Sequence, residues 1–133
     1  MISFSNLEHS INFTIAEEVR VSLIELLELC LETDNSEFVT QLGPLCTMLG
    51  KATQDQNPEM KNICAKFCGK LATTLGKRVG GYMKTIVEAL VTNLQHQHSK
   101  VRKETLRGLK DVLACKGAEP YLTGGPIAQL KFS

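Results

Sequence analysis

Two cysteines and two histidines have types and spacings that could serve zinc binding. Cys64 and Cys68 lie four residues apart, about one helical turn, and His96 and His98 lie in a polar turn. A zinc site of this ligand type needs all four donors to converge on one point. However, both cysteines align with leucines at core positions of the internal repeat described below. We therefore interpret them as small buried thiols and expect no metal site.

A glycine-rich basic segment, residues 75–84 (LGKRVGGYMK), could suggest a phosphate-binding loop. Such a loop needs its glycines between a strand and a helix and ends in Lys-Ser or Lys-Thr. Neither condition holds here, so we prefer a helix C-cap followed by an irregular helix start. The sequence also contains no serine in a nucleophile elbow and no paired carboxylates in an apolar setting. We expect a non-enzymatic protein with no cofactor and no small-molecule substrate.

The charged residues are unevenly distributed along the 133-residue chain. The total is 15 Lys and Arg against 14 Asp and Glu, a formal net charge of +1. Residues 1–59 carry two basic and ten acidic residues, or −8, whereas residues 60–133 carry 13 basic and four acidic residues, or +9. The near-neutral total argues against a general polyanion binder, and the division predicts a strong electrostatic dipole.

The sequence also constrains the expected location of the protein. There is no run of 18 apolar residues, so no membrane span is expected. The first ten residues, MISFSNLEHS, lack the basic and apolar stretches of a signal peptide. The five cysteines form no tight disulfide framework, which is typical of reduced thiols. We expect a cytoplasmic protein without membrane contact.

The chain repeats itself with a period of 41 residues. Shifted by this period, the segments that begin at Glu17, Pro58 and Ser99 align without a gap, with apolar residues at helical spacing. Each segment carries an apolar residue followed by a basic one: Val19-Arg20, Met60-Lys61 and Val101-Arg102. The intervening segments keep the same register. The period therefore predicts an all-α fold, an α-α superhelix or HEAT/armadillo-like solenoid of antiparallel helix hairpins.

We expect helices over about 17–33, 36–52 and 79–94, and two further helices, one that begins at Pro58 after an Asn57 cap and one that is capped by Ser99. Thr14 and Glu17 are expected to form a capping box for the first helix. Pro44 should bend the second of these helices. We expect residues 1–133 to form a single array of about three units that is a fragment of a longer solenoid. The expected divisions are the end of one unit at 1–34, whole units at 35–76 and 77–117, and the start of another at 118–133.

The repeat resembles HEAT repeats in particular residues. These are the Asn57-Pro58 turn, the apolar–basic pairs and the proline in the preceding helix at Pro44. The first and third units depart from the pattern because they lack the turn proline. In HEAT arrays the basic residue reaches an acid or a carbonyl of a neighbouring unit. The resemblance therefore implies a stacking ladder formed by Arg20, Lys61 and Arg102.

A closer resemblance involves residues 94–117, LQHQHSKVRKETLRGLKDVLACKG. This stretch is similar to a unit of the dynein axonemal assembly factor 5 family, in which a His-Gln-His turn precedes Lys-Val-Arg and a helix. The matching residues here are His96, Gln97, His98, Lys100, Val101 and Arg102. The resemblance implies a cytoplasmic scaffold for the preassembly of axonemal dynein arms. Its implied partners are proteins, namely dynein chains and chaperones.

The charges on the repeated helices form the candidate partner-binding site. The first helix carries Glu25, Glu28 and Glu32. Aligned or adjacent positions on the later helices carry Lys66, Lys70, Lys103, Arg107 and Lys110. In HEAT arrays these helices line the concave side, so the resemblance implies a surface that passes from acidic to basic. Two interpretations stay open: an ordinary solvated face, or a groove that orients a protein partner.

Other functions compatible with the repeat are those of a HEAT adaptor of another class, such as a microtubule, transport or translation scaffold. A nucleic-acid binder that uses the basic C-terminal half is a weaker alternative, because the sequence has few aromatic residues for stacking on bases.

Overall fold

The computed structural model describes residues 16–115, which form helices joined by short turns and contain no strand. The elements are α2 (Glu17–Thr33), α3 (Ser36–Thr40), α4 (Leu42–Ala52), α5 (Pro58–Leu75), the 3₁₀ helix η1 (Gly76–Tyr82), α6 (Met83–Asn93) and α7 (Ser99–Leu113). The all-α prediction is therefore confirmed.

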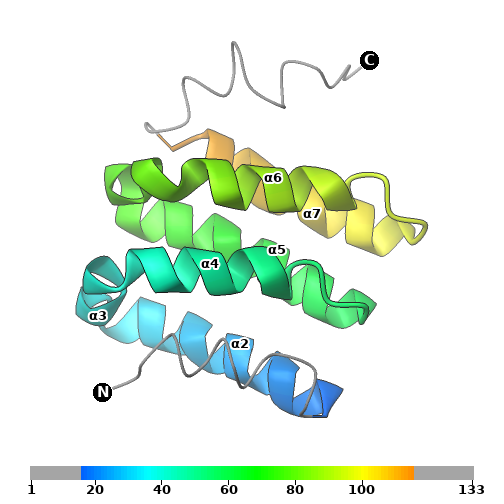
Figure 1. The fold of residues 1–133 in the computed structure, drawn as a ribbon, viewed down its shortest axis with the longest axis horizontal. Coiled ribbons are helices and arrows are strands. Elements are labelled where there is room, and N and C mark those ends of the chain that lie inside the picture. Colours follow the sequence, from blue (N-terminus) through cyan, green and yellow to red (C-terminus); the bar gives the residue numbers. More distant parts are fainter. Residues whose placement is uncertain (1–15, 116–133) are drawn as a thin grey trace.

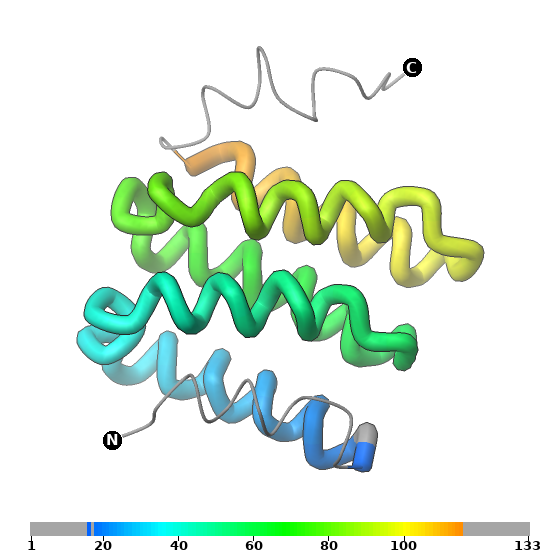
Figure 2. The backbone as a smooth tube through the Cα atoms, viewed as in Figure 1, coloured from blue at the N-terminus to red at the C-terminus, as the bar shows by residue number. Residues whose placement is uncertain are grey.

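The helices form two layers (Figure 1). Helices α4 and α6 lie side by side in one layer, and α2, α5 and α7 lie in the other. Figure 2 shows how the chain crosses between the layers at each turn. Helix α5 is central, because it packs against both α2 and α7. The chain is an all-α repeat solenoid of antiparallel helix hairpins.

The 41-residue register of the sequence is reproduced in the backbone. Helices α2, α5 and α7 begin at Glu17, Pro58 and Ser99, so successive starts are 41 residues apart. Helices α4 and α6 begin at Leu42 and Met83, again 41 residues apart. Val19, Met60 and Val101 are each the third residue of their helix. Corresponding residues therefore occupy corresponding places in successive stacked helices.

The central helix α5 shows why this sequence forms the array. Asn57 precedes it, and the Asn57 side chain accepts a hydrogen bond of 2.8 Å from the Glu59 backbone N–H. Pro58 occupies the first turn, where its missing N–H has no helical partner to lose. Large side chains such as Met60, Phe67 and Leu71 are fully buried, and each contributes about 1.5–3 kcal/mol through burial.

Two of the expected helices are interrupted. The helix expected over 36–52 is split into α3 and α4 at Gln41, rather than merely bent. Pro44 explains the break, because it cannot donate to the carbonyl of Thr40 and its ring crowds that carbonyl. The helix expected over 79–94 instead begins as the 3₁₀ helix η1 and becomes α-helical only at Met83.

The ends of the repeated helices also differ partly from expectation. Ser99 is the first residue of α7 and His98 is its N-cap residue, so Ser99 does not cap the helix. Ala16 is at the N-cap of α2 and makes no side-chain cap bond. The expected cap Thr14 lies outside the described residues. Gly76, at φ +58°, ends α5 as expected for a C-cap glycine.

Candidate protein-docking surface

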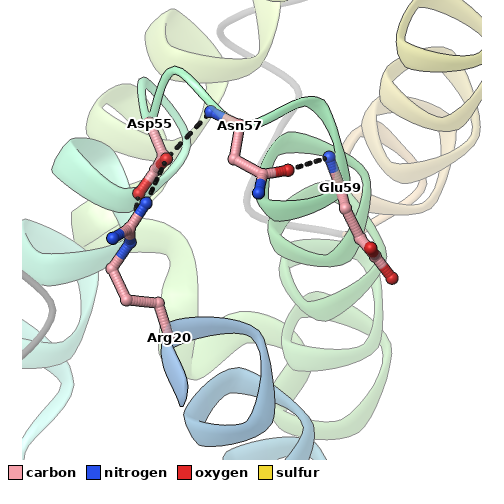
Figure 3. A network of polar contacts seen from close by, with 4 residues as sticks. All are labelled: Arg20, Asp55, Asn57 and Glu59. Atoms are coloured by element: carbon pink, nitrogen blue, oxygen red, sulfur yellow. Dashed lines mark hydrogen bonds and ion pairs between the residues drawn. The ribbon is translucent and has the colours of Figure 1, made fainter. Parts of the chain in front are cut away.

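A buried ion pair ties α2 to the turn before α5 (Figure 3). The Arg20 Nε donates to Asp55 Oδ2 at 2.8 Å, and its Nη2 donates to Oδ1 at 3.0 Å. Both side chains are more than nine-tenths buried. Asp55 Oδ1 also accepts a bond of 2.9 Å from the Asn57 backbone N–H, so the carboxylate shapes the turn that starts α5. A bidentate ion pair of this kind fixes both the distance and the orientation of two neighbouring units.

The other two basic residues of the expected ladder take different partners. Lys61 Nζ donates to Asn93 Oδ1 at 3.1 Å, and Asn93 Nδ2 donates to the carbonyl of Thr53 at 2.8 Å. Arg102 instead donates to the carbonyls of His96 and Gln97 at 2.7 and 3.0 Å, in the turn before its own helix. The ladder is therefore confirmed as a link between units for Arg20 and Lys61, but not for Arg102.

Four of the eight candidate partner-binding residues are brought together in the middle of the surface. Lys70 Nζ lies 2.5 Å from Glu28 Oε1 and also contacts Glu32, while Lys66 Nζ lies 3.5 Å from Glu28 Oε1. The hydrogen bond from Lys70 lowers the pKa of Glu32, and the bonds to Glu28 and Glu32 raise the pKa of Lys70. These charges join α2 to α5 and neutralise one another locally.

The remaining four candidates lie toward the two ends of the surface. Glu25 is exposed on α2, and Lys103 and Lys110 are exposed on α7. Among residues 16–115, none of these three forms an ion pair. Arg107 pairs with Glu104 of its own helix at 3.0 Å. The surface therefore has an acidic end on α2, a neutralised centre and a basic end on α7.

A groove of about 390 Å³ opens beside the acidic end. It is lined by Glu18, Val21, Ser22 and Glu25 of α2 and by Asn57 and Glu59 at the start of α5. Sequence reasoning missed Glu18 and Glu59 as companions of Glu25. Glu18 and Glu59 each lie in the first turn of a helix, and they are 41 residues apart in the repeat. This matched position could have indicated that they lie close to Glu25. Three carboxylates around one groove favour positively charged groups of a partner.

The cysteines that could have served as zinc ligands lie in the core. Cys64 and Cys68 are buried, as the alignment with leucines predicts. Burial raises the pKa of Cys68 to about 12 and raises that of Cys64 well above its ordinary value. Thiols held in the protonated form are poor metal ligands and poor nucleophiles. The rings of His96 and His98 lie 5.1 Å apart in the turn before α7.

Residues 16–115 lack two further features, a metal-binding cluster and a membrane-spanning helix. No group of three or more His, Cys, Asp and Glu side chains within residues 16–115 is arranged to hold a metal ion. In the same part of the chain, no helix is both long enough and apolar enough to cross a membrane.

Comparison with known proteins places the chain in a family. A family model described as "Dynein axonemal assembly factor 5-like, TPR repeats" matches residues 8–121, which is most of the sequence. The chain belongs to this family. The family description names TPR repeats, whereas a 41-residue helix hairpin has the length of a HEAT repeat and TPR units have about 34 residues.

A relative of this assembly-factor family is the dynein axonemal assembly factor 5 of Xenopus laevis. It is 26% identical to this chain over 88 residues, which is 66% of the chain and 10% of the relative. The chain thus spans about a tenth of the length of that relative. No solved structure matches the chain.

Proposed function

We propose that this chain is a non-enzymatic protein-binding scaffold that acts in the cytoplasmic preassembly of axonemal dynein arms. Membership of the assembly factor 5-like family supports this function, and so does the likeness to a protein named for that role. The proposed partners are dynein chains and the chaperones that handle them. We further propose that the chain is one continuous array, divided near residues 35 and 77, within a longer solenoid.

The observation that carries the proposal is the charge arrangement on the α2–α5–α7 layer. An extended helical layer offers a partner many contact points without a deep pocket. The acidic end at Glu25 and the basic end at Lys103 and Lys110 give this layer a direction. Opposite charges at two ends orient a partner during encounter, even where each exposed charge contributes little to affinity alone.

The test is a charge reversal at the basic end. The variant Lys103→Glu, Arg107→Glu, Lys110→Glu is expressed in ciliated cells, and co-purified dynein chains are quantified. We expect a large loss of dynein chains with no loss of helicity, because all three side chains are exposed. The matched control is Lys77→Glu, Arg78→Glu, Lys84→Glu, which reverses three exposed basic residues of η1 and α6. We expect this control to retain the wild-type level.

Equal recovery from both triple variants would contradict the docking role of the basic end. The scaffold proposal would also fail if the wild-type chain bound nucleic acid tightly with a steep dependence on salt concentration, since that behaviour is typical of phosphate contacts.

A further inference from the structure

Helix α2 carries a stripe of exposed apolar side chains. Val19, Leu26 and Leu29 are 48%, 50% and 56% exposed. Their spacing of seven and three residues places them on one side of the helix. Isolated exposed leucines are common on protein surfaces, but an apolar stripe along a helix indicates an interface. We call these three residues the α2 stripe.

The repeat register shows what normally covers this position. One period later, Val19 and Leu26 correspond to Met60 and Phe67 of α5, which are both fully buried. The ring of Phe67 lies 6.4 Å from that of Phe38, in the short helix α3 that precedes α4. Val101 of α7, two periods from Val19, is also fully buried. In the other two units the positions of Val19 and Leu26 are therefore buried against neighbouring helices, so this part of the α2 stripe has the character of a surface that receives a helix. The counterparts of Leu29 are Lys70 and Asp111, which are not buried.

The charges beside the stripe specify the chemistry of that helix. Glu18 and Glu25 are exposed next to it and form no ion pair within the described part of the chain. With Glu59 they line the groove of about 390 Å³ between α2 and α5. Glu32, further along, is already held by Lys70. A complementary helix needs an apolar face toward the stripe and Lys or Arg toward Glu18 and Glu25.

We propose that the α2 stripe and its acidic border dock a basic amphipathic helix of a partner protein. This inference rests on the proposed scaffold function and names the chemistry of one partner element. Burial of Val19, Leu26 and Leu29 supplies the affinity, because apolar area is removed from water. The carboxylates select a basic partner over an acidic one and fix its direction along α2.

The test measures peptide binding to the full chain by fluorescence anisotropy. The probe is an amphipathic helical peptide with leucines on one face and lysines on the other. The control peptide has glutamates in place of the lysines. We expect the basic peptide to bind at least about tenfold more tightly, a difference of about 1.4 kcal/mol. We expect Leu26→Asp to weaken it by about tenfold while the helices are retained, since Leu26 is half exposed.

Charge reversal then distinguishes the contribution of the Glu18 and Glu25 carboxylates to peptide binding from that of the α2 stripe. We expect Glu18→Lys with Glu25→Lys to invert the preference between the two peptides. The matched control Lys84→Glu, an exposed charge on α6, should leave both affinities unchanged. Equal binding of the two peptides, or full binding by Leu26→Asp, would overturn the proposal.

Three other occupants would also overturn it. Peptide binding to the chain alone that is lost in a longer solenoid with a further unit before α2 would assign the stripe to that preceding unit. A dimer that forms with rising concentration and is abolished by Leu26→Asp would assign the stripe to a second copy. Peptide binding that occurs only in a Phe4→Asp, Leu7→Asp variant would assign it to the chain's own N-terminal segment. Recovery of dynein chains is measured with Leu26→Asp in parallel. If recovery depends on Lys103, Arg107 and Lys110 while the peptide fails to bind, only this inference is lost.

Discussion

The junctions α2–α5 and α5–α7 are built on the same register but use different chemistry. At the first, Arg20 and Asp55 form a buried ion pair. One period later the corresponding residues are Lys61 and His96, and Lys61 bonds to Asn93 instead. His96 stands in the second turn where Asp55 stands in the first, so the second junction lacks the buried bidentate ion pair of the first.

The distance between the packed helices also differs between the two junctions. A Cβ atom at Gly108 of α7 would lie 2.3 Å from the carbonyl oxygen of Ala65 of α5, so these two backbones are in direct contact. The residues one period earlier are Phe67 and Ile24, both large and fully buried. Large side chains keep α2 and α5 further apart, whereas Ala65 and Gly108 allow α5 and α7 to meet.

A third pair of matched positions also differs between the two junctions. Glu28 and Lys70 form an ion pair across the first junction. Their counterparts are Gly69 and Asp111, where a Cβ on the glycine would lie 2.9 Å from Asp111 Oδ2. The comparison teaches that a 41-residue period specifies where helices lie, while the side chains at matched positions decide whether charge or close packing joins them.

The largest effect is expected from breaking the ion pair of the first junction. Asp55→Ala leaves Arg20 buried without its carboxylate, which typically costs about 3–5 kcal/mol. Chemical denaturation measures the change in the free energy of unfolding. The double variant Arg20→Met, Asp55→Ala should recover part of the loss, because the buried guanidinium is then removed together with the carboxylate. A single variant within about 0.5 kcal/mol of wild type would contradict a structural role for the pair.

A smaller loss is expected from adding one methyl group at the second junction. Gly108→Ala forces α5 and α7 apart, because the atom it meets is backbone and cannot rotate away. Overpacking of this kind costs about 1–3 kcal/mol. Gly81→Ala is the control, since a Cβ there has nothing within 4 Å. If both variants unfold at the same denaturant concentration, the two helices are not in close contact.

A substitution at His96 can introduce at the second junction an ion pair like that between Arg20 and Asp55 at the first. His96→Asp places a carboxylate where Asp55 lies one period earlier, within reach of Lys61. We expect the thermal unfolding midpoint to rise, by less than the losses above, because the turn is more exposed than that of Asp55. The gain should disappear in a Lys61→Met background. A gain that persists without Lys61 would show that the two turns are not equivalent.

The smallest effect is a pH dependence at the same turn. Partial burial, followed by the charges of Lys61, His98 and Arg102, lowers the pKa of His96 from its ordinary value of 6.5. Its Nδ1 accepts a 3.1 Å bond from the His98 backbone N–H, which only the unprotonated nitrogen can do. The neutral form is therefore favoured by folding, and the stability it contributes is present above pH 6.5 and lost as the pH falls through the lowered pKa.

The check compares unfolding midpoints of wild type and His96→Asn across that pH range. Asparagine offers an acceptor oxygen but does not titrate. We expect wild type to lose stability relative to the variant as the pH falls below about 6.5. A relative gain on acidification would contradict the assigned sign.

The helical period made much of this fold predictable. It predicted the start of α5, the start of α7 to within one residue, and the burial of Cys64 and Cys68, because apolar spacing reports directly on helix faces. The interruption at Gln41 was underestimated, because a proline permits either a bend or a break and packing decides between them.

The details of the surface were less accessible to sequence reasoning. The mutual neutralisation of Glu28 and Glu32 by Lys66 and Lys70 depends on how far α2 and α5 are displaced along one another, which a pattern does not report. Asp55 could have been found, because it aligns with His96 and precedes the Asn57-Pro58 turn. The contact of Gly108 with Ala65 required the backbone positions themselves.

The most direct test of the stacked register is a set of distances between spin labels at Glu25, Lys66 and Arg107. These residues are exposed on α2, α5 and α7 and are separated by 41 positions. Cys30 and Cys115, the partly exposed thiols among the described residues, are first replaced by serine. Pulsed electron paramagnetic resonance should give similar distances for 25–66 and 66–107, and about twice that distance for 25–107. A 25–107 distance no longer than the other two would contradict three helices stacked in sequence.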